Sequence, residues 1–199
     1  FGYGQVDFDW TDLVYTVEQS SDSTCKRNAG LNHGAETASG KIAHGQEFTA
    51  ATADYIRTAS FNGVPSTAVT VSAWIKTTAA SRAIAHQGRN SSDADTEYGF
   101  EIDESGYLKF WDYDAGYGFD DLSSATVNNG DYRYVQFTKN GTVGKFYIDG
   151  LYVNTVNAAK DAAYSSNDFV VGADYRGGNK YFEGVIDELR VAAVELSAD

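Results

Sequence analysis

The most informative segment of the chain lies near its C-terminal end and reads Tyr181-Phe-Glu-Gly-Val-Ile-Asp-Glu-Leu-Arg-Val-Ala-Ala-Val194. Its length and its apolar residues predict a long β-strand. A shorter apolar strand is predicted just before it, at Phe169–Gly172. Successive side chains of a strand point to opposite faces, so each of the two strands needs a face that packs into a core.

Asp187 is the anomaly of the long strand. The alternation places it on the same face as Val185, Leu189 and Val191, which is expected to be the core face. A buried carboxylate is costly unless it is paired, hydrogen-bonded or bound to a metal. Ca²⁺ takes carboxylate, carbonyl and water oxygens, so we predict calcium at Asp187; the alternative is a carboxylate that accepts backbone N–H bonds. The carboxylates that could complete such a site are Asp54 and Asp9.

Period-two hydrophobic runs between turn signals recur along the rest of the chain. Val69–Thr77 is the strongest of these predicted strands. Hairpin turns are predicted at Ser105-Gly106, Asn140-Gly141 and Asp149-Gly150, because Gly, Asn and Asp accept the positive φ that such turns need. Residues 18–47 are polar and rich in Gly and are expected to form a long irregular connection. The pattern predicts an all-β fold, a two-sheet antiparallel sandwich or jelly roll.

The composition limits the classes of partner. A net charge of -13, from 28 acidic and 15 basic residues, argues against binding to nucleic acid or to an anionic membrane. It suits cation binding, a salty environment or solubility alone. No apolar run approaches the ~18 residues that a membrane span needs. Cys25 is the single cysteine, and no cysteine or histidine cluster indicates zinc. The chain contains no Met, which we interpret as a processed mature form or a piece of a longer protein.

Five segments in this order resemble the laminin-G-like, concanavalin A-like jelly-roll superfamily of lectin and glucanase modules. They are Gly40–Phe48 leading to Asp54–Ile56, Val69–Ile75, Tyr98–Ile102 with Gly106–Phe110, Lys145–Gly150, and Phe182–Val191 ending in Leu196–Ala198. The resemblance covers roughly residues 12–199, so residues 1–11 are expected to form an N-terminal extension or an extra strand. One departure is Tyr132-Arg-Tyr134, which stands where the family usually has Trp-His.

The resemblance implies two antiparallel sheets, often a Ca²⁺ ion, and binding of carbohydrate or protein on one sheet face or on the rim loops. It also implies a secreted, extracellular or cell-surface location. We therefore expect a non-catalytic module that binds a glycan or a glycosylated partner. The alternative is a structural subunit of an extracellular assembly, which self-associates through the aromatic run at residues 1–10.

Two groups of residues are candidates for ligand binding. The segment 111–121 is expected to be a Gly-rich loop whose aromatic rings stack on sugars, or fold back to cap the sandwich. Its candidate ligand-binding residues are Trp111, Tyr113 and Tyr117, and its candidate calcium ligands are Asp112 and Asp114. Outside it, the candidates are Trp74, on the opposite face from its apolar neighbours, and His86 and Arg89 after a predicted strand. For each, a covered or solvated side chain is the alternative.

Catalysis has little support in the sequence. Glu101 and Asp103 share one strand face, as two carboxylates of a glycosidase would. The longer carboxylate pattern of the jelly-roll glucanases is absent, however. His33, His44 and His86 are scattered and form no Ser/His/Asp or Cys/His arrangement that the sequence reveals.

Overall fold

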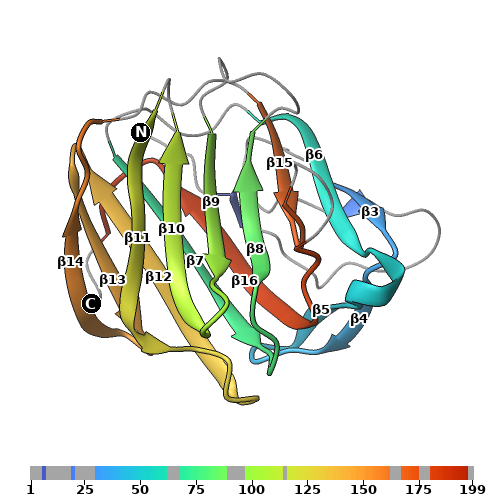
Figure 1. The fold of residues 1–199 in the computed structure, drawn as a ribbon. Helices are drawn as coiled ribbons and strands as arrows, with labels where there is room; N and C mark the ends of the chain where they lie inside the picture. The colour runs from blue at the N-terminus through green and yellow to red at the C-terminus, as the bar shows by residue number, and fades with distance from the viewer. Residues whose placement is uncertain are drawn as a thin grey trace.

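The computed structural model describes residues 6–7, 19–20, 30–61, 68–88, 97–113, 116–161, 167–174 and 180–196. In this part of the chain two antiparallel sheets of eight strands each pack face to face (Figure 1). The described residues contain no α-helix, and one 3-10 turn, Ala50–Thr52, precedes β6. The prediction of an all-β jelly-roll sandwich is confirmed.

Sheet 1 has the order β14-β13-β12-β7-β16-β5-β4, and β1 pairs with β16 from outside this path. Its strands are β14 Leu151–Asn157, β13 Val143–Ile148, β12 Tyr132–Asn140, β7 Ala68–Lys76, β16 Gly184–Ala192, β5 His44–Phe48, β4 Glu36–Ser39 and β1 Val6–Asp7. Every pairing within it is antiparallel. The predicted strands near residues 69–77 and 181–194 therefore lie side by side as β7 and β16.

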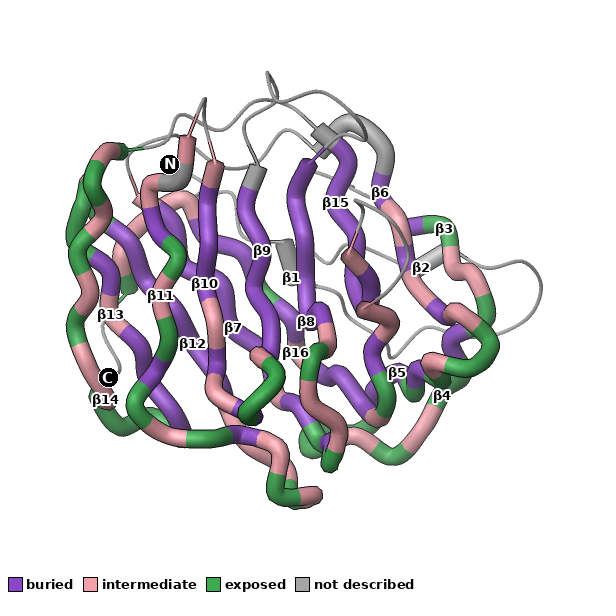
Figure 2. The backbone as a smooth tube through the Cα atoms, viewed as in Figure 1, coloured by how far each residue is buried: buried purple, intermediate pink, exposed green. Residues whose placement is uncertain are grey.

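Sheet 2 has the order β11-β10-β9-β8-β15-β6-β3-β2 and lies in front of sheet 1 in Figure 1. Its strands are β11 Tyr117–Thr126, β10 Tyr107–Tyr113, β9 Glu97–Ile102, β8 Arg82–Gln87, β15 Asn167–Val171, β6 Tyr55–Phe61, β3 Gly30–His33 and β2 Gln19–Ser20. The long strands of both sheets are buried along most of their length, whereas exposed residues gather at the turns and the outer edges (Figure 2).

Aromatic rings join the two sheets across the core. Phe110 of β10 stacks on Phe137 of β12, with 4.0 Å between ring centroids. Phe146 and Phe119 pack against the same Phe137 ring at 4.8 and 5.6 Å. All four side chains are fully buried, and each such burial stabilises the fold by about 1.5–3 kcal/mol relative to exposure. This cluster fixes the spacing of the sheets and leaves their outer faces for other contacts.

Two of the predicted hairpins show the local reason for their turns. Ile148 pairs with Leu151 across the two-residue turn Asp149-Gly150, whose φ angles are 54° and 77°. Both angles are in the region that Asp and Gly tolerate, as predicted. The other turn lies one residue later than predicted, because Asn140 still pairs with the first residue of β13 and only Gly141 has a positive φ, 59°.

The predicted irregular connection over residues 18–47 is wrong for its described part. Strands β3, β4 and most of β5 lie within it. These strands are four or five residues long, and all of β4 is polar or small. Strands this short contain too few residues for a clear apolar alternation, so a sequence pattern does not detect them.

The alternation assumed for β16 is also wrong, because the strand contains a β-bulge. Ile186 lies opposite the core residue Ile75, and Asp187 lies opposite Trp74 on the outer face of sheet 1. The register then shifts, and Glu188 has a φ of 49°. A bulge inserts one extra residue and so reverses the alternation beyond it. The core-facing residues of β16 are therefore Ile186, Leu189 and Val191.

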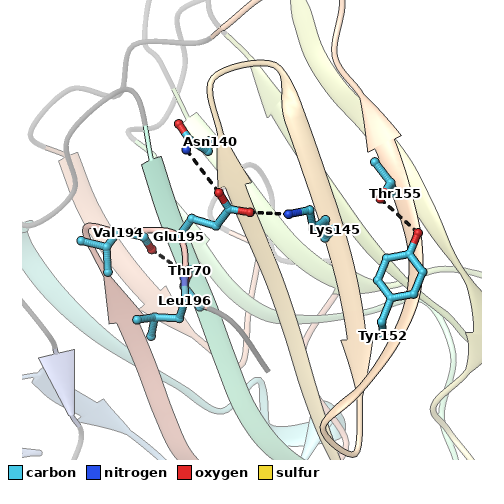
Figure 3. Close-up of polar contacts among 8 residues, drawn as sticks. All are labelled: Thr70, Asn140, Lys145, Tyr152, Thr155, Val194, Glu195 and Leu196. Atoms are coloured by element: carbon cyan, nitrogen blue, oxygen red, sulfur yellow. Dashed lines mark hydrogen bonds and ion pairs between the residues drawn. The ribbon is translucent and has the colours of Figure 1, made fainter. Parts of the chain in front are cut away.

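The chain after β16 folds over one end of the outer face of sheet 1 (Figure 3). The Thr70 hydroxyl donates to the carbonyl of Val194 at 2.7 Å and accepts from the backbone N–H of Leu196 at 3.0 Å. Between these two, Glu195 accepts from Lys145 at 2.7 Å and from Asn140 at 3.2 Å. This end of the face is thereby covered. The other end of the same two strands, β7 and β12, stays open.

Candidate functional site

A groove of about 510 Å³ lies at the open end of the outer face of sheet 1. It is lined by Lys41, Trp74, Asp131, Tyr132, Arg133, Tyr134, Asp149 and Gly150. These residues come from the turn before β5, from β7, from β12 and from the β13–β14 turn. The pairing of β7 with β12 creates the site, because it sets Trp74 opposite Tyr134 and Lys76 opposite Tyr132.

Aromatic rings line the groove. The rings of Trp74 and Tyr134 lie 5.4 Å apart at an angle of 57°, and both side chains are half-buried. The Tyr134 hydroxyl donates to Gln136 Oε1 at 3.2 Å, and the Tyr132 hydroxyl donates to the carbonyl of Ser39. Each tyrosine is thus held by its hydroxyl while part of its surface remains exposed, which gives the groove an ordered aromatic lining.

Asp187 fixes the wall of the groove. Its Oδ2 accepts from the backbone N–H of Ile42 at 2.8 Å, and the N–H of Lys41 also points to this carboxylate. A Cβ on Gly40 would lie 2.5 Å from Oδ2, so the turn can approach this closely only with glycine there. Burial raises the pKa of Asp187 above its usual value, although these N–H groups oppose the shift. The Lys41 ammonium lies 5.0 Å from the centre of the Trp74 ring.

An ion pair closes the opposite rim. Arg133 Nε lies 3.0 Å from Asp149 Oδ2, and Asp149 Oδ1 accepts from the backbone N–H of Tyr134 at 2.9 Å. Asp149 therefore ties the β13–β14 turn to β12. Asp131, just before β12, accepts from the Asn129 side chain at 3.1 Å. The groove thus combines an aromatic lining with fixed polar groups at its rim.

Trp111 is placed quite differently from Trp74, although both are candidates from the sequence. It is only 7% exposed, on the outer face of sheet 2, and its Nε1 donates to Glu101 Oε1 at 2.7 Å. The ring packs directly on Gly99, where a Cβ would lie 2.3 Å from Nε1. Trp111 is thus packed flat on the strand β9, and neither of the two arrangements predicted for a loop at 111–121 describes it.

The neighbours of Trp111 are also engaged. His86 is buried, with its ring 5.2 Å from that of Trp111 and its Nδ1 3.3 Å from Asp174 Oδ1. The second oxygen of Glu101 accepts from Lys180 at 2.5 Å. Asp103, the other carboxylate considered for glycoside hydrolysis, accepts from the backbone N–H groups of the β9–β10 turn. Neither carboxylate lines the groove.

The expected loop at residues 111–121 is wrong. Trp111–Tyr113 end β10, and the chain from residue 117 onward forms β11, with Trp111 opposite Asp120 and Tyr113 opposite Tyr117. The aromatic and acidic residues alternate along these strands, and Phe119 is part of the core. Gly and Asp are depleted in strands, which is why the composition indicated a loop. Arg89, Asp9 and Asp114 lie outside the described residues.

The candidate calcium ligands do not come together in the part of the chain that the structure describes. No group of three or more His, Cys, Asp or Glu side chains there could hold a metal ion. Asp112 is buried, and its oxygens accept from Lys139 at 3.2 Å and from the N–H of Phe119 at 2.7 Å. Asp54 accepts from the N–H of Thr49 at 2.8 Å. The surroundings of Asp187 are N–H groups, which favour an anion and disfavour a cation.

One oxygen of Asp187 lacks the N–H partners that its other oxygen has. Asp187 Oδ1 is buried and has no hydrogen-bond partner among the described residues. A single carboxylate oxygen is too little for calcium, which takes six to eight oxygens. The described residues therefore do not fit a calcium site at Asp187, and the contacts observed are those of the alternative, a carboxylate that accepts backbone N–H bonds.

Trp74 is the one groove residue that sequence reasoning named as a candidate; Lys41, Tyr132 and Tyr134 are among those it missed. The two tyrosines carry a usable signal, because residues two apart on a strand share a face. Tyr132-Arg-Tyr134 was noted only as a departure from the family pattern. Lys41 carries no such signal, because its position depends on a turn that is held by Asp187 from a distant strand.

Comparison with known proteins agrees with this architecture. A sequence profile of the concanavalin A-like lectin/glucanases superfamily, of the Laminin_G_3 type, matches residues 50–199. The chain belongs to this superfamily. No relative was found among curated proteins.

Solved structures share the fold at low sequence identity. Domain 4 of AbnA, a GH43 extracellular arabinanase from Geobacillus stearothermophilus solved with arabinotriose, has a TM-score of 0.77 and 19% identity over 98% of this chain and 93% of its own. The binding domain of Paraclostridial Mosquitocidal Protein 1 has a TM-score of 0.72 and 12% identity, over 98% of this chain and 50% of its own. Mouse laminin alpha1 domains LG4-5 have a TM-score of 0.64 and 17% identity, over 82% and 46%.

The mosquitocidal protein and laminin structures are longer than this chain, which spans about half of the length of each. Such low identities show the shared fold and do not transfer a ligand. Among the described residues, no helix is long and apolar enough to cross a membrane.

Proposed function

We propose that this chain is a non-catalytic binding module that takes a saccharide, free or on a glycosylated protein, in the groove of sheet 1. The observation that carries the proposal is the half-exposed Trp74 beside Tyr134, with Tyr132 next along the strand. Sugar rings present apolar C–H faces that stack on aromatic rings, and their hydroxyls need polar partners nearby. Asp131 and Asp149 supply carboxylate oxygens at the rim.

The structural relatives support this proposal at a coarse level. Domain 4 of AbnA was solved with arabinotriose, and several others are toxin or receptor binding domains. Most of them are binding domains, which favours a non-catalytic role for this chain too. AbnA is described as extracellular. We propose a secreted or cell-surface location on the same grounds.

A glycan array tests the proposal, probed with the full chain and with Trp74→Ala. We expect the full chain to bind at least one class of saccharide and Trp74→Ala to lose that binding. Tyr152→Ala is the matched control, because Tyr152 is an exposed aromatic residue of β14 that does not line the groove. Equal loss in both variants, or no binding of any saccharide by the full chain, would contradict the proposal.

A structural subunit of an extracellular assembly is the second candidate. The edge strand β14 favours it, because Leu151 and Tyr152 are 72% and 59% exposed there. Exposed apolar edge strands invite pairing with another chain. The N-terminal segment named from the sequence supports it less, because Val6 and Asp7 already pair with β16 of the same chain. Sedimentation velocity of the full chain, of a form lacking residues 1–10 and of Leu151→Lys separates the two. A binding module is monomeric and active in all three, whereas an assembly subunit forms oligomers that are lost in the form whose contact has been removed.

A further inference from the structure

We propose that the groove selects an anionic saccharide, whose charge is a uronate carboxylate or a sulfate ester. This proposal rests on the proposed function and names the class of its ligand. It is motivated by Lys41 and Lys76, two lysines that lie over aromatic rings of the site. Their ammonium groups are 5.0 Å from the Trp74 ring centre and 5.5 Å from the Tyr132 ring centre.

Neither ammonium is neutralised by an ion pair within the part of the chain that the structure describes. Both lysines are exposed, and neither forms an ion pair with a carboxylate of the described residues. Of the five other described lysines, Lys160 also has no such pair, and four do form one, within 3.2 Å. These pairs are Lys109–Asp120, Lys139–Asp112, Lys145–Glu195 and Lys180–Glu101. Lys41 lines the groove, and Lys76 lies beside it, against the ring of the lining residue Tyr132. In a chain with 28 acidic and 15 basic residues, two lysines without ion pairs this close together are an uneven distribution of charge.

The carboxylates around the groove do not cancel these charges by contact. Asp149 is paired with Arg133 and with a backbone N–H, and Asp131 is bonded to Asn129. Asp187 lies buried beneath the Lys41 turn, with its Oδ2 bonded to that turn. Glu47 lies two strands away from Lys76 in sheet 1. The pKa of the Tyr132 hydroxyl is raised first by burial, then by the charge of Asp187 and last by the charge of Glu47.

The geometry suits a sugar that carries its charge at the ring edge. A pyranose ring packed against the half-exposed aromatic lining can turn a substituent at its edge toward Lys41, whose exposed ammonium lies 5.0 Å from the Trp74 ring centre and can move aside on its flexible side chain. An ammonium pairs strongly with a carboxylate or sulfate that has lost part of its water, as it does in a groove. The net charge of -13 repels such a ligand at long range, but salt screens this repulsion beyond about 8 Å in physiological salt. The local lysines therefore decide the preference.

The test compares saccharides that differ only in charge. The first pair is oligogalacturonate and its methyl ester, and the second is a sulfated galactan oligosaccharide and its desulfated form. Both pairs are measured alongside the neutral glycans of the array. Affinity is measured by titration of tryptophan fluorescence at low and high NaCl. The proteins are the full chain, the double variant Lys41→Gln with Lys76→Gln, and Lys109→Gln. The last removes the same kind of charge from the other sheet.

We expect the charged member of at least one pair to bind more tightly, and its dissociation constant to rise with NaCl. The double variant should lose about tenfold in affinity for it, since two partly exposed charge contacts supply roughly 1.4 kcal/mol together. Lys109→Gln should bind as the full chain does.

A preference for the charged member of the carboxylate pair or of the sulfate pair identifies the charged group that the groove recognises. Binding of neutral saccharides alone, unchanged by NaCl and by the double variant, overturns this inference and leaves the proposed function standing. Binding of no saccharide overturns both.

Discussion

The outer faces of the two sheets each carry a tryptophan with polar neighbours, and the two rings differ in how far they are covered by the described residues. On sheet 1, Trp74 is half-buried, with the Tyr134 ring 5.4 Å and the Lys41 ammonium 5.0 Å from the centre of its ring. On sheet 2, Trp111 is buried against Gly99, and its N–H is already bonded to Glu101. Both residues are tryptophans, but only the Trp74 ring keeps enough exposed surface to contact a ligand.

The difference lies in what covers each ring. The opposite neighbour of Trp111 on β9 is a glycine, so its ring lies down on the sheet, and its N–H meets a carboxylate two residues along that strand. The opposite neighbour of Trp74 on β12 is a tyrosine, so its ring is propped beside a second ring and keeps an exposed surface. Cross-strand partners, more than residue type, therefore decide whether a surface tryptophan stabilises the fold or can bind a ligand.

The largest effect is expected for Trp111→Ala. Removing a buried tryptophan costs about 3–5 kcal/mol and leaves the buried Glu101 with one bond fewer. At about 2–4 °C per kcal/mol for a domain of this size, the melting temperature should fall by roughly 10 °C. Thermal unfolding followed by circular dichroism measures it. A melting temperature unchanged within error would mean that Trp111 is not the packed residue described here.

Trp74→Ala is the counterpart and should behave in the opposite way. It removes a half-exposed ring, so the melting temperature should fall by a few degrees at most. Affinity for the saccharide bound by the full chain should drop about tenfold to a hundredfold, the loss typical of one stacking aromatic residue. Calorimetric titration of both tryptophan variants gives the comparison directly. If Trp111→Ala loses affinity while still folded and Trp74→Ala does not, the binding face has been assigned to the wrong sheet.

A smaller effect is expected at Asp187, which links the fold to the groove wall. Its folded-state pKa is raised by burial, so the folded protein binds a proton here more readily than the unfolded chain does. Its contribution to stability is therefore fully present below the usual value of 3.8 and is lost as pH rises through the raised pKa. Asp187→Asn should remove this part of the pH dependence, measured as the difference between the urea unfolding free energies of the two proteins across that window.

The same variant should also weaken saccharide binding by a few-fold, because the Lys41 turn loses an anchor. Glu183→Gln is a suitable control, since Glu183 accepts a backbone N–H from Ala50 on an exposed surface outside the groove. A pH dependence that is identical in the full chain and in Asp187→Asn would mean that Asp187 titrates normally, in spite of its burial.

The sequence predicted the architecture well, because long strands and tight turns leave local signals. Strand β7 follows from alternation, and the turn at Asp149-Gly150 follows from the positive φ that Asp and Gly accept. Sequence reasoning failed at the bulge of β16. The extra residue reverses the alternation there, and nothing in the sequence Asp187-Glu-Leu189 indicates it. Burial of Asp187 was predicted correctly, but for the wrong reason.

The site was harder to predict than the fold, because it depends on which strands become neighbours. Trp74 was named from its own strand, whereas Tyr134 became its partner only through the pairing of β7 with β12. Lys41 reaches the groove through the hydrogen bond of its turn to Asp187, 145 residues away from Ile42. Long-range contacts of this kind determine a binding surface and cannot be derived from spacing along the chain.

The smallest effect is expected from removing calcium, and it tests whether Asp187 is a turn anchor or a metal ligand. An ion bound only to the folded state at a hundredfold excess over Kd would add about 2.7 kcal/mol, or roughly 5–10 °C in melting temperature. The Asp187 carboxylate instead faces the N–H groups of Lys41 and Ile42, and no further carboxylate or histidine cluster joins it among the described residues. We therefore expect the melting temperatures measured in EDTA and in Ca²⁺ to agree within about 1 °C, because an ion that does not bind the folded state does not stabilise it.

The opposite outcome would establish an ion at this carboxylate. The melting temperature would then fall by several degrees in EDTA, Ca²⁺ would restore it, Mg²⁺ would restore it poorly, and Asp187→Asn would show no such fall. Its remaining ligands would then have to come from the segments outside the described residues, where Asp9 and Asp114 lie.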